Sequence, residues 1–397
     1  MKSIDQVNFK GKKVLVRVDY NVPLDDQFRV TSTTRIERTL DTIHKITKEG
    51  GVAILMSHLG RPKGKVVDSM SLKHIVPVVS KVMGQEIHFL GDALSDVAET
   101  KVKSLQPGDI ALLENLRFHE EEEKGDVAFA EKIARLGDIF VNDAFGAAHR
   151  AHASTTIIVR FFPGQSYAGY LLYNEDANLQ KALTNCQRPF TAIIGGSKVS
   201  SKISIIENLL SKVDNLIITG GMCYTFLKAF GENIGNSVVE PEMLDTAKHI
   251  ITQAYLKGVN LYLPVDSVCA DQFAENANVM ITENNTIPDG WLGLDIGPKT
   301  INKFSTVIAN SRTILWNGPA GVFEFKNFSH GTKAMGICVG AATISGSFSL
   351  VGGGDTITAI GQYGLKDMVS YISTGGGAML EYLEGKTLPG IEALNND

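Results

Sequence analysis

The chain has 397 residues, of which 44% are hydrophobic and 20% charged, and its formal net charge is -5. This length predicts two domains, and the composition is that of a globular protein. The small negative charge argues against bulk binding to nucleic acid or to a membrane surface, and no segment resembles a signal peptide or a membrane span. Four widely spaced cysteines without metal-ligand spacing indicate reduced thiols and a cytoplasmic protein.

Short apolar runs recur along the chain and predict parallel strands that are buried on both faces. In chain order they are 14–18, 52–56, 110–113, 139–141, 192–194, 216–218, 261–263, 313–316, 349–351 and 371–373. Helical spacing of apolar residues predicts one helix over 35–49, ended by the glycines at 50 and 51. The glutamate run 120–123 predicts a solvated loop or the start of a helix.

A domain boundary is predicted between Phe162 and Pro189, because Pro163-Gly164 breaks the chain and 170–183 has the pattern of a helix. Repeated strand–helix units predict an α/β fold: two open parallel-sheet (Rossmann-like) domains joined by a helical hinge, bilobal with a central cleft. We expect the first domain at 1–165, the connector at 166–188 and the second domain at 189–382.

The two halves carry different anion-binding devices. Nine of the eleven arginines precede residue 161, whereas two triple-glycine runs lie at 352–354 and 375–377. Arginine grips phosphate or carboxylate with a planar fork, and glycine lets backbone amides approach a phosphate at the start of a helix. Polar and glycine residues also follow the predicted strands, at the sheet edge where such folds bind ligands. The sequence therefore predicts two anionic ligands, one for each half.

In the second half, the glycines at 352–354 suit a strand end that opens a helix, and Asp355 is suited to hold Mg²⁺ on a phosphate. The alternative is a plain turn in which Asp355 caps the helix. Lys198 and Lys202 are four residues apart and would share one helix face, where an anion would relieve their repulsion. Exposed surface lysines are the alternative. Glu324 is a weaker candidate, as an acceptor for a ribose.

In the first half, several basic residues lie in or beside strand-end segments: Arg17, Arg35, Arg61, Arg117, Arg150, His58, His149 and His152. Any single arginine at such a place is more often a structural ion pair than a ligand contact. Arg17 keeps the structural interpretation because it lies inside a strand. His149 and His152 are interpreted as loop-orienting residues, and the absence of a third ligand nearby in the sequence disfavours a metal site.

Taken together, these segments resemble the phosphoglycerate kinase family. The resemblance covers almost the whole chain, in the family's order, at 17–23, 58–62, 113–118, 142–152, 195–203, 292–298, 316–324, 352–356 and 374–378. It implies a monomeric, hinge-bending enzyme of glycolysis and gluconeogenesis. The implied reaction is reversible, Mg²⁺-dependent phosphoryl transfer between 1,3-bisphosphoglycerate and ADP, giving 3-phosphoglycerate and ATP. The segment 388–391 matches the family's C-terminal return, so we expect 383–397 to belong to the first domain.

The resemblance also implies residue roles. The implied phosphoglycerate site comprises Asp19, Tyr20, Asn21, Arg35, His58, Leu59, Gly60, Arg61, Arg117 and Arg150. The implied nucleotide site comprises Lys198, Lys202, Gly293, Glu324, Gly353, Gly354, Asp355 and Thr356, with Asp355 as the Mg²⁺ ligand. The implied catalytic residues are Arg35, Lys198, Lys202, Gly353 and Gly376.

The chain departs from the family pattern at Tyr20, Ala147, Ser197, Ser201 and Met379. Ser201 stands where an acidic residue is common, which predicts a more positive surrounding for the two neighbouring lysines. Two other functions fit parts of the sequence. Another phosphotransferase acting on an acyl phosphate or carboxylate would not need the arginine-rich half. A non-catalytic anion-binding protein would not need Lys202 or Asp355.

Overall fold

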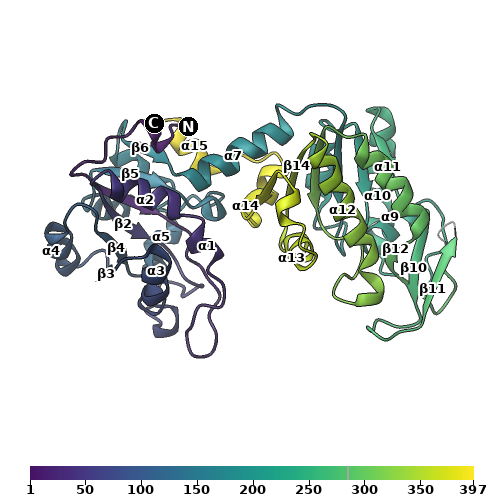
Figure 1. The fold of residues 1–397 in the computed structure, drawn as a ribbon, viewed down its shortest axis with the longest axis horizontal. Coiled ribbons are helices and arrows are strands. Elements are labelled where there is room, and N and C mark those ends of the chain that lie inside the picture. The colour runs from purple at the N-terminus through teal and green to yellow at the C-terminus, as the bar shows by residue number, and fades with distance from the viewer. Residues whose placement is uncertain (284–285) are drawn as a thin grey trace. The chain divides into compact units, whose positions relative to one another are not determined.

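The computed structural model describes residues 1–283 and 286–397, and the chain forms two compact units. Unit 1 comprises Met1–Asp176 and Thr387–Asp397, and unit 2 comprises Ala177–Lys386. The helix predicted over 170–183 is confirmed as α7 (Tyr170–Leu183). The division between the two units falls within this helix. The C-terminal helix α15 (Pro389–Asn395) packs in unit 1 against β6 (Ser166–Ala168), close to the N-terminus in Figure 1.

Unit 1 contains a six-stranded parallel sheet with the strand order β3-β4-β2-β1-β5-β6. Its other strands are β1 (Lys13–Arg17), β2 (Val52–Met56), β3 (Ile87–Gly91), β4 (Ile110–Leu113) and β5 (Ile139–Asn142). Its other α-helices are α1 (Thr34–Glu37), α2 (Leu40–Lys48), α3 (Val76–Met83), α4 (Asp96–Ser104), α5 (Glu120–Lys124) and α6 (Val127–Ala134). Strand β2 is buried at every position, as expected of a strand covered on both faces.

Unit 2 contains a second six-stranded parallel sheet, in the order β15-β14-β13-β7-β8-β9, and a three-stranded antiparallel sheet, β11-β10-β12. The strands are β7 (Phe190–Ile194), β8 (Asn215–Ile218), β9 (Asn260–Tyr262), β10 (Asp266–Ala270), β11 (Val279–Glu283), β12 (Leu292–Ile296), β13 (Thr313–Asn317), β14 (Phe348–Gly352) and β15 (Tyr371–Ser373). The α-helices are α8 (Ile203–Leu209), α9 (Cys223–Ala229), α10 (Leu244–Leu256), α11 (Pro298–Ala309), α12 (His330–Ile344), α13 (Gly354–Gln362) and α14 (Gly377–Leu383).

The two parallel sheets confirm the predicted α/β fold class, and all ten predicted strands are present. Five strands, β3, β6, β10, β11 and β12, were not predicted. In unit 2 the chain order runs outward from β7 to β9 and then restarts at β13 on the other side of β7. The carboxyl ends of β7 and β13 therefore flank a topological switch point, where folds of this kind bind ligands.

The prediction of one helix over 35–49 is wrong, because the segment forms α1 and α2 with a break between them. At the break, the buried hydroxyl of Thr39 donates to the Ile36 carbonyl at 2.8 Å and lies 2.8 Å from the Tyr20 hydroxyl. These contacts hold Thr39 against the core at the point where the helix is interrupted. Arg35 therefore lies on the short helix α1.

The prediction of a solvated run at 120–123 is wrong for one of its residues. The run does begin a helix, α5, but Glu122 is fully buried. Within the described ranges, none of the helices has the length and apolar character that a membrane crossing requires.

Candidate functional site

Asp19 and Asn21 follow β1 and tie together the loops at one edge of the sheet in unit 1. The Asp19 carboxylate accepts from Arg35 Nη1 at 2.8 Å, and Asn21 Oδ1 accepts from the Gly60 amide at 2.9 Å. Gly146, after β5, passes so close that a β-carbon there would come within 2.6 Å of Asp19 Oδ2. The ends of β1, β2 and β5 thus bring these predicted residues together.

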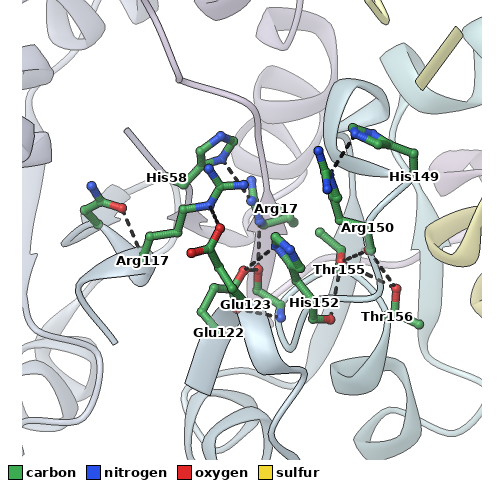
Figure 2. A network of polar contacts seen from close by, with 12 residues as sticks. Arg17, His58, Arg117, Glu122, Glu123, His149, Arg150, His152, Thr155 and Thr156 are labelled. Atoms are coloured by element: carbon green, nitrogen blue, oxygen red, sulfur yellow. Dashed lines mark hydrogen bonds and ion pairs between the residues drawn. The ribbon is translucent and has the colours of Figure 1, made fainter. Parts of the chain in front are cut away.

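Arg17 lies inside unit 1, at the centre of the polar network in Figure 2. Its Nε donates to Ser154 Oγ at 2.8 Å, and its Nη2 lies 3.2 Å from His58 Nδ1. Ser154 in turn donates to Glu122, from Oγ at 2.6 Å and from its backbone amide at 3.0 Å. The guanidinium is fully buried, which agrees with the structural interpretation of Arg17.

Two histidines of this network are held neutral. Burial lowers the pKa of His58 well below its ordinary value, and the charges of Arg17 and Arg117 lower it further. Burial and the same two arginines lower the pKa of His152 to about 3. His152 Nδ1 lies 4.0 Å from the buried carboxylate of Glu122, beyond hydrogen-bond distance. At neutral pH each ring therefore offers one N–H donor and no net charge.

The remaining predicted arginines differ in exposure. Arg117 is almost buried, donates to the Gly60 carbonyl at 3.1 Å and pairs with Glu123 at 3.4 Å. Arg35, Arg61 and Arg150 are exposed. Arg117 is therefore held inside the protein. The other three guanidinium groups face solvent, where they can meet an anion, although Arg35 is paired with Asp19 and Arg150 donates to His149 at 2.9 Å.

Tyr20 and Leu59 lie in the core of unit 1. The Tyr20 ring is fully buried, and its amide donates to Ser57 Oγ at 2.8 Å. Leu59 is 4% exposed, and its carbonyl accepts from Asn115 Nδ2 at 2.7 Å. These two residues therefore contribute to the site by anchoring the backbone on which the neighbouring polar residues lie.

Unit 2 has a cavity of about 690 Å³ at the switch point between β7 and β13. The chain crosses itself closely at its base, because a β-carbon on Gly195 would come within 2.3 Å of the Pro319 carbonyl oxygen. The predicted residues Gly293, Glu324 and Asp355 line the cavity, and Glu324 and Asp355 are exposed. Its lining also includes Gly196, Ser197, Gly220, Gly221, Tyr224, Val238, Phe273, Pro319 and Phe323.

Both triple-glycine runs open helices. Gly353 has a φ of 93° and is the N-cap of α13, and Gly376 has a φ of 52° and precedes α14 in the same way. Asp355 lies in the first turn of α13, so it is not the cap that the simpler interpretation required. Thr356 is fully buried and its Oγ1 accepts from the Gly318 amide at 2.7 Å, which joins the start of α13 to the end of β13.

The prediction that Lys198 and Lys202 share one helix face is wrong, because α8 begins only at Ile203. Lys202 is part-buried and its ammonium donates to Asn317 Oδ1. Burial lowers the pKa of Lys202, and the negative charge of Asp355 opposes that shift. Lys198 is exposed on the loop that precedes the helix. The two lysines are thus placed by a turn, with Lys202 directed at the end of β13.

The Asp355 carboxylate suits a magnesium ion bound mainly by phosphate. It is exposed, it lines the unit 2 cavity, and its negative charge acts on Lys202. The described residues, 1–283 and 286–397, contain no group of three or more His, Cys, Asp or Glu side chains that could enclose a metal. Mg²⁺ is commonly held by one or two carboxylates together with substrate phosphates and water, so this single oxygen ligand fits it.

Sequence reasoning missed the apolar wall of the cavity. Gly293, in β12, packs so tightly on Tyr224 that an added β-carbon would lie 1.9 Å from the tyrosine hydroxyl oxygen. The Gly293 amide also donates to Ser237 Oγ at 2.9 Å. Phe273 and Phe323 complete the wall from two other loops. No spacing in the sequence marks these aromatic residues as neighbours, although Gly220-Gly221 at the end of β8 points to the same edge of the sheet.

The chain matches known proteins over its full length. The family model described as phosphoglycerate kinase matches residues 4–386. The chain is 51% identical to the phosphoglycerate kinase of Porphyromonas gingivalis and 49% identical to that of Chloroherpeton thalassium, and each match covers at least 99% of both chains. The phosphoglycerate kinase structure from Coxiella burnetii superposes with a TM-score of 0.92 at 41% identity, covering 99% of this chain and 98% of that one. On this full-length identity, the chain belongs to the phosphoglycerate kinase family.

Proposed function

We propose that the chain transfers a phosphoryl group between 1,3-bisphosphoglycerate held by unit 1 and Mg-ADP held by unit 2, giving 3-phosphoglycerate and ATP. Phosphoglycerate kinase activity in glycolysis, a phosphotransfer with a carboxyl group as acceptor, follows from the close full-length relatives. The observation that carries the assignment of sites is the unit 2 cavity, which combines a glycine-rich helix start with the Asp355 carboxylate.

In unit 1, the proposed ligand is a small acid that carries a phosphate and a hydroxyl group. The exposed guanidinium groups of Arg35, Arg61 and Arg150 suit its phosphate and carboxylate, which arginine binds bidentately. Asp19 and Asn21 supply oxygen acceptors for its hydroxyl group. His58, held neutral, adds a donor that stays the same across physiological pH.

In unit 2, the proposed ligand is a magnesium nucleotide. The amides at the start of α13, after Gly353, suit its phosphates, and Asp355 would hold Mg²⁺. When bound, Mg²⁺ would neutralise phosphate charge during transfer. The apolar wall around Tyr224 suits the flat face of a base, and Glu324 at the rim suits the ribose hydroxyl groups.

Transfer of the phosphoryl group needs positioning and charge neutralisation more than covalent help. In the proposed mechanism Arg35 from unit 1 and Lys202 from unit 2 stabilise the charge on the oxygens of the migrating group. The amides after Gly353 and Gly376 and the ammonium group of Lys198 support the same phosphates. Because the two ligands belong to different units, the reaction needs α7 to act as a hinge that joins the sites and excludes water.

The decisive measurement is a coupled assay of ATP- and Mg²⁺-dependent turnover of 3-phosphoglycerate. Absence of turnover with folded protein would overturn the proposed function. Arg35→Ala and Lys202→Ala should each lower kcat at least ~100-fold, about 2.7 kcal/mol of transition-state stabilisation. Near-normal turnover in either variant would contradict the role given to that residue. Acetate as an alternative acceptor tests the rival phosphotransferase, and light scattering tests the proposed monomeric state.

A further inference from the structure

We infer that Glu240 is a positioning residue for the proposed nucleotide site, because it fastens the loop that carries Lys198 and Lys202. The inference rests on the proposed function of that loop. Glu240 lies between α9 and α10, far from the loop in sequence, and no motif of the chain points to it. Its carboxylate nevertheless receives three hydrogen bonds from two consecutive residues of the loop.

The three bonds use both oxygens of the carboxylate. Oε2 accepts from the backbone amides of Val199 and Ser200, at 2.5 and 3.2 Å, and Oε1 accepts from Ser200 Oγ at 2.5 Å. Hydrogen bonds to an ionised acceptor are about twice as strong as neutral ones. Val199 and Ser200 lie between the two lysines, so the carboxylate fixes the turn from which both ammonium groups extend.

Glu240 is itself held by the body of unit 2. Its amide donates at 3.2 Å to the hydroxyl of Thr225, a buried residue of α9. The start of α9 also supports the loop, because the Met222 amide donates to the Gly196 carbonyl at 2.9 Å. At Gly221 a β-carbon would come within 3.3 Å of the Ser197 α-carbon. The start of α9 therefore supports the first part of the loop, at Gly196 and Ser197, and the Glu240 carboxylate holds the part that follows.

Glu240 also changes the charge around the loop. Burial alone would raise the pKa of Glu240, but the hydrogen bonds from Ser200 and Val199 outweigh it and the pKa is lowered, with a further contribution from the charge of Lys198. The sequence predicted a more positive surrounding than usual for the two lysines because Ser201 stands where an acidic residue is common. The structure supplies a negative charge beside Lys198 from Glu240 instead. The ammonium group of Lys202 donates instead to Asn317 Oδ1.

The test compares Glu240→Gln with Glu242→Gln in the full-length enzyme. Glu242 is an exposed residue two positions along the chain, and its replacement makes the same change in net charge. Binding of Mg-ADP is measured by calorimetry, and KM is measured for both substrates. We expect Glu240→Gln to raise the Kd for Mg-ADP by ~10-fold, the loss of one charge-assisted hydrogen bond, and to lower kcat, with KM for 3-phosphoglycerate unchanged. Glu242→Gln should match the wild type.

A second variant keeps the inference testable if Glu240→Gln does not fold. Ser200→Ala removes only the hydroxyl donor and should raise the Kd for Mg-ADP by ~2–3-fold, while Glu240→Asp should recover part of the affinity. Wild-type Mg-ADP affinity in a folded Glu240 variant, or an equal rise in KM for both substrates, would overturn the positioning role. If Lys202→Ala also binds and turns over normally, the nucleotide-site assignment fails as well. If Lys202→Ala is impaired, only the role of Glu240 fails.

Discussion

Replacing Glu122 by glutamine removes a negative charge from the interior of unit 1 while keeping the size of the side chain. The carboxylate is fully buried and accepts both the amide and the hydroxyl of Ser154. Ser154 Oγ in turn accepts from Arg17 Nε, so the negative charge of Glu122 faces the buried guanidinium through one hydroxyl group. The negative charge of Glu122 favours the charged form of Arg17, whose pKa burial lowers.

The expected cost follows from two losses. A glutamine carbonyl can accept only one of the two Ser154 bonds, and a buried donor left unsatisfied costs about 1–3 kcal/mol. Breaking a buried charge pair from one side costs about 3–5 kcal/mol, and here the hydroxyl between the charges places the effect at the lower end. We therefore expect Glu122→Gln to lower the free energy of unfolding by about 4–6 kcal/mol, roughly 8–24 °C in Tm for a unit of this size.

Urea denaturation of the whole chain measures this cost. Far-UV circular dichroism follows both units, whereas tryptophan fluorescence follows unit 2, because both tryptophans, Trp291 and Trp316, lie there. The matched control is Glu123→Gln, which removes the same charge from a side chain that is 40% exposed and pairs with Arg117 at 3.4 Å. The control should cost less than about 1 kcal/mol. If Glu122→Gln costs no more than Glu123→Gln, the buried network does not stabilise unit 1 as argued.

Three further predictions concern ionisation, close packing and the metal. In a proton NMR titration from pH 7.5 to 5.5, His58 should not titrate, because burial and neighbouring arginines lower its pKa. His119 should titrate above the ordinary histidine value of 6.5, because its hydrogen bond with Asp92 raises its pKa. A His58 transition near 6.5 would contradict this prediction. Gly293→Ala should displace Tyr224 and raise KM for ATP at least ~10-fold, with KM for 3-phosphoglycerate unchanged. A KM for ATP equal to that of the wild type would show that the residues around Tyr224 accommodate the added methyl group. Asp355→Asn should raise the Mg²⁺ concentration for half-maximal activity several-fold, and an unchanged Mg²⁺ dependence would remove it as a ligand.

The parallel sheets could be predicted because their strands are continuous apolar runs with polar or glycine residues directly after them. Strands β7 and β13 are buried at every position, and a run of that kind has few alternatives in a globular chain. The antiparallel sheet carries no such signal. Strand β11 is mostly exposed and β10 begins with Asp266 and Ser267, so neither stands out from a loop.

Burial of a charged residue could not be predicted from its neighbours in sequence. Four successive glutamates look alike in the run 120–123, and the partners that draw one of them inside, Ser154 and Arg17, lie 32 and 105 positions away from it. The same limit applies to the turn at 198–202. A spacing of four suggested a helix, but hydrogen bonds to the distant Glu240 shape the segment as a turn.

The arginine content of unit 1 overstates the positive charge that a ligand meets. Arg35 is paired with Asp19 at 2.8 Å and Arg117 with Glu123 at 3.4 Å, so a phosphoglycerate would have to compete with carboxylates for these cations. This pairing keeps neighbouring guanidinium groups from repelling one another and orders them before binding, at a cost in net attraction. In unit 2, Lys202 meets a neutral amide, so a phosphate there displaces no anion from it. The two proposed sites thus reach anion binding by different routes: ordered and partly neutralised arginines in one, and glycine-exposed amides with a part-buried lysine in the other.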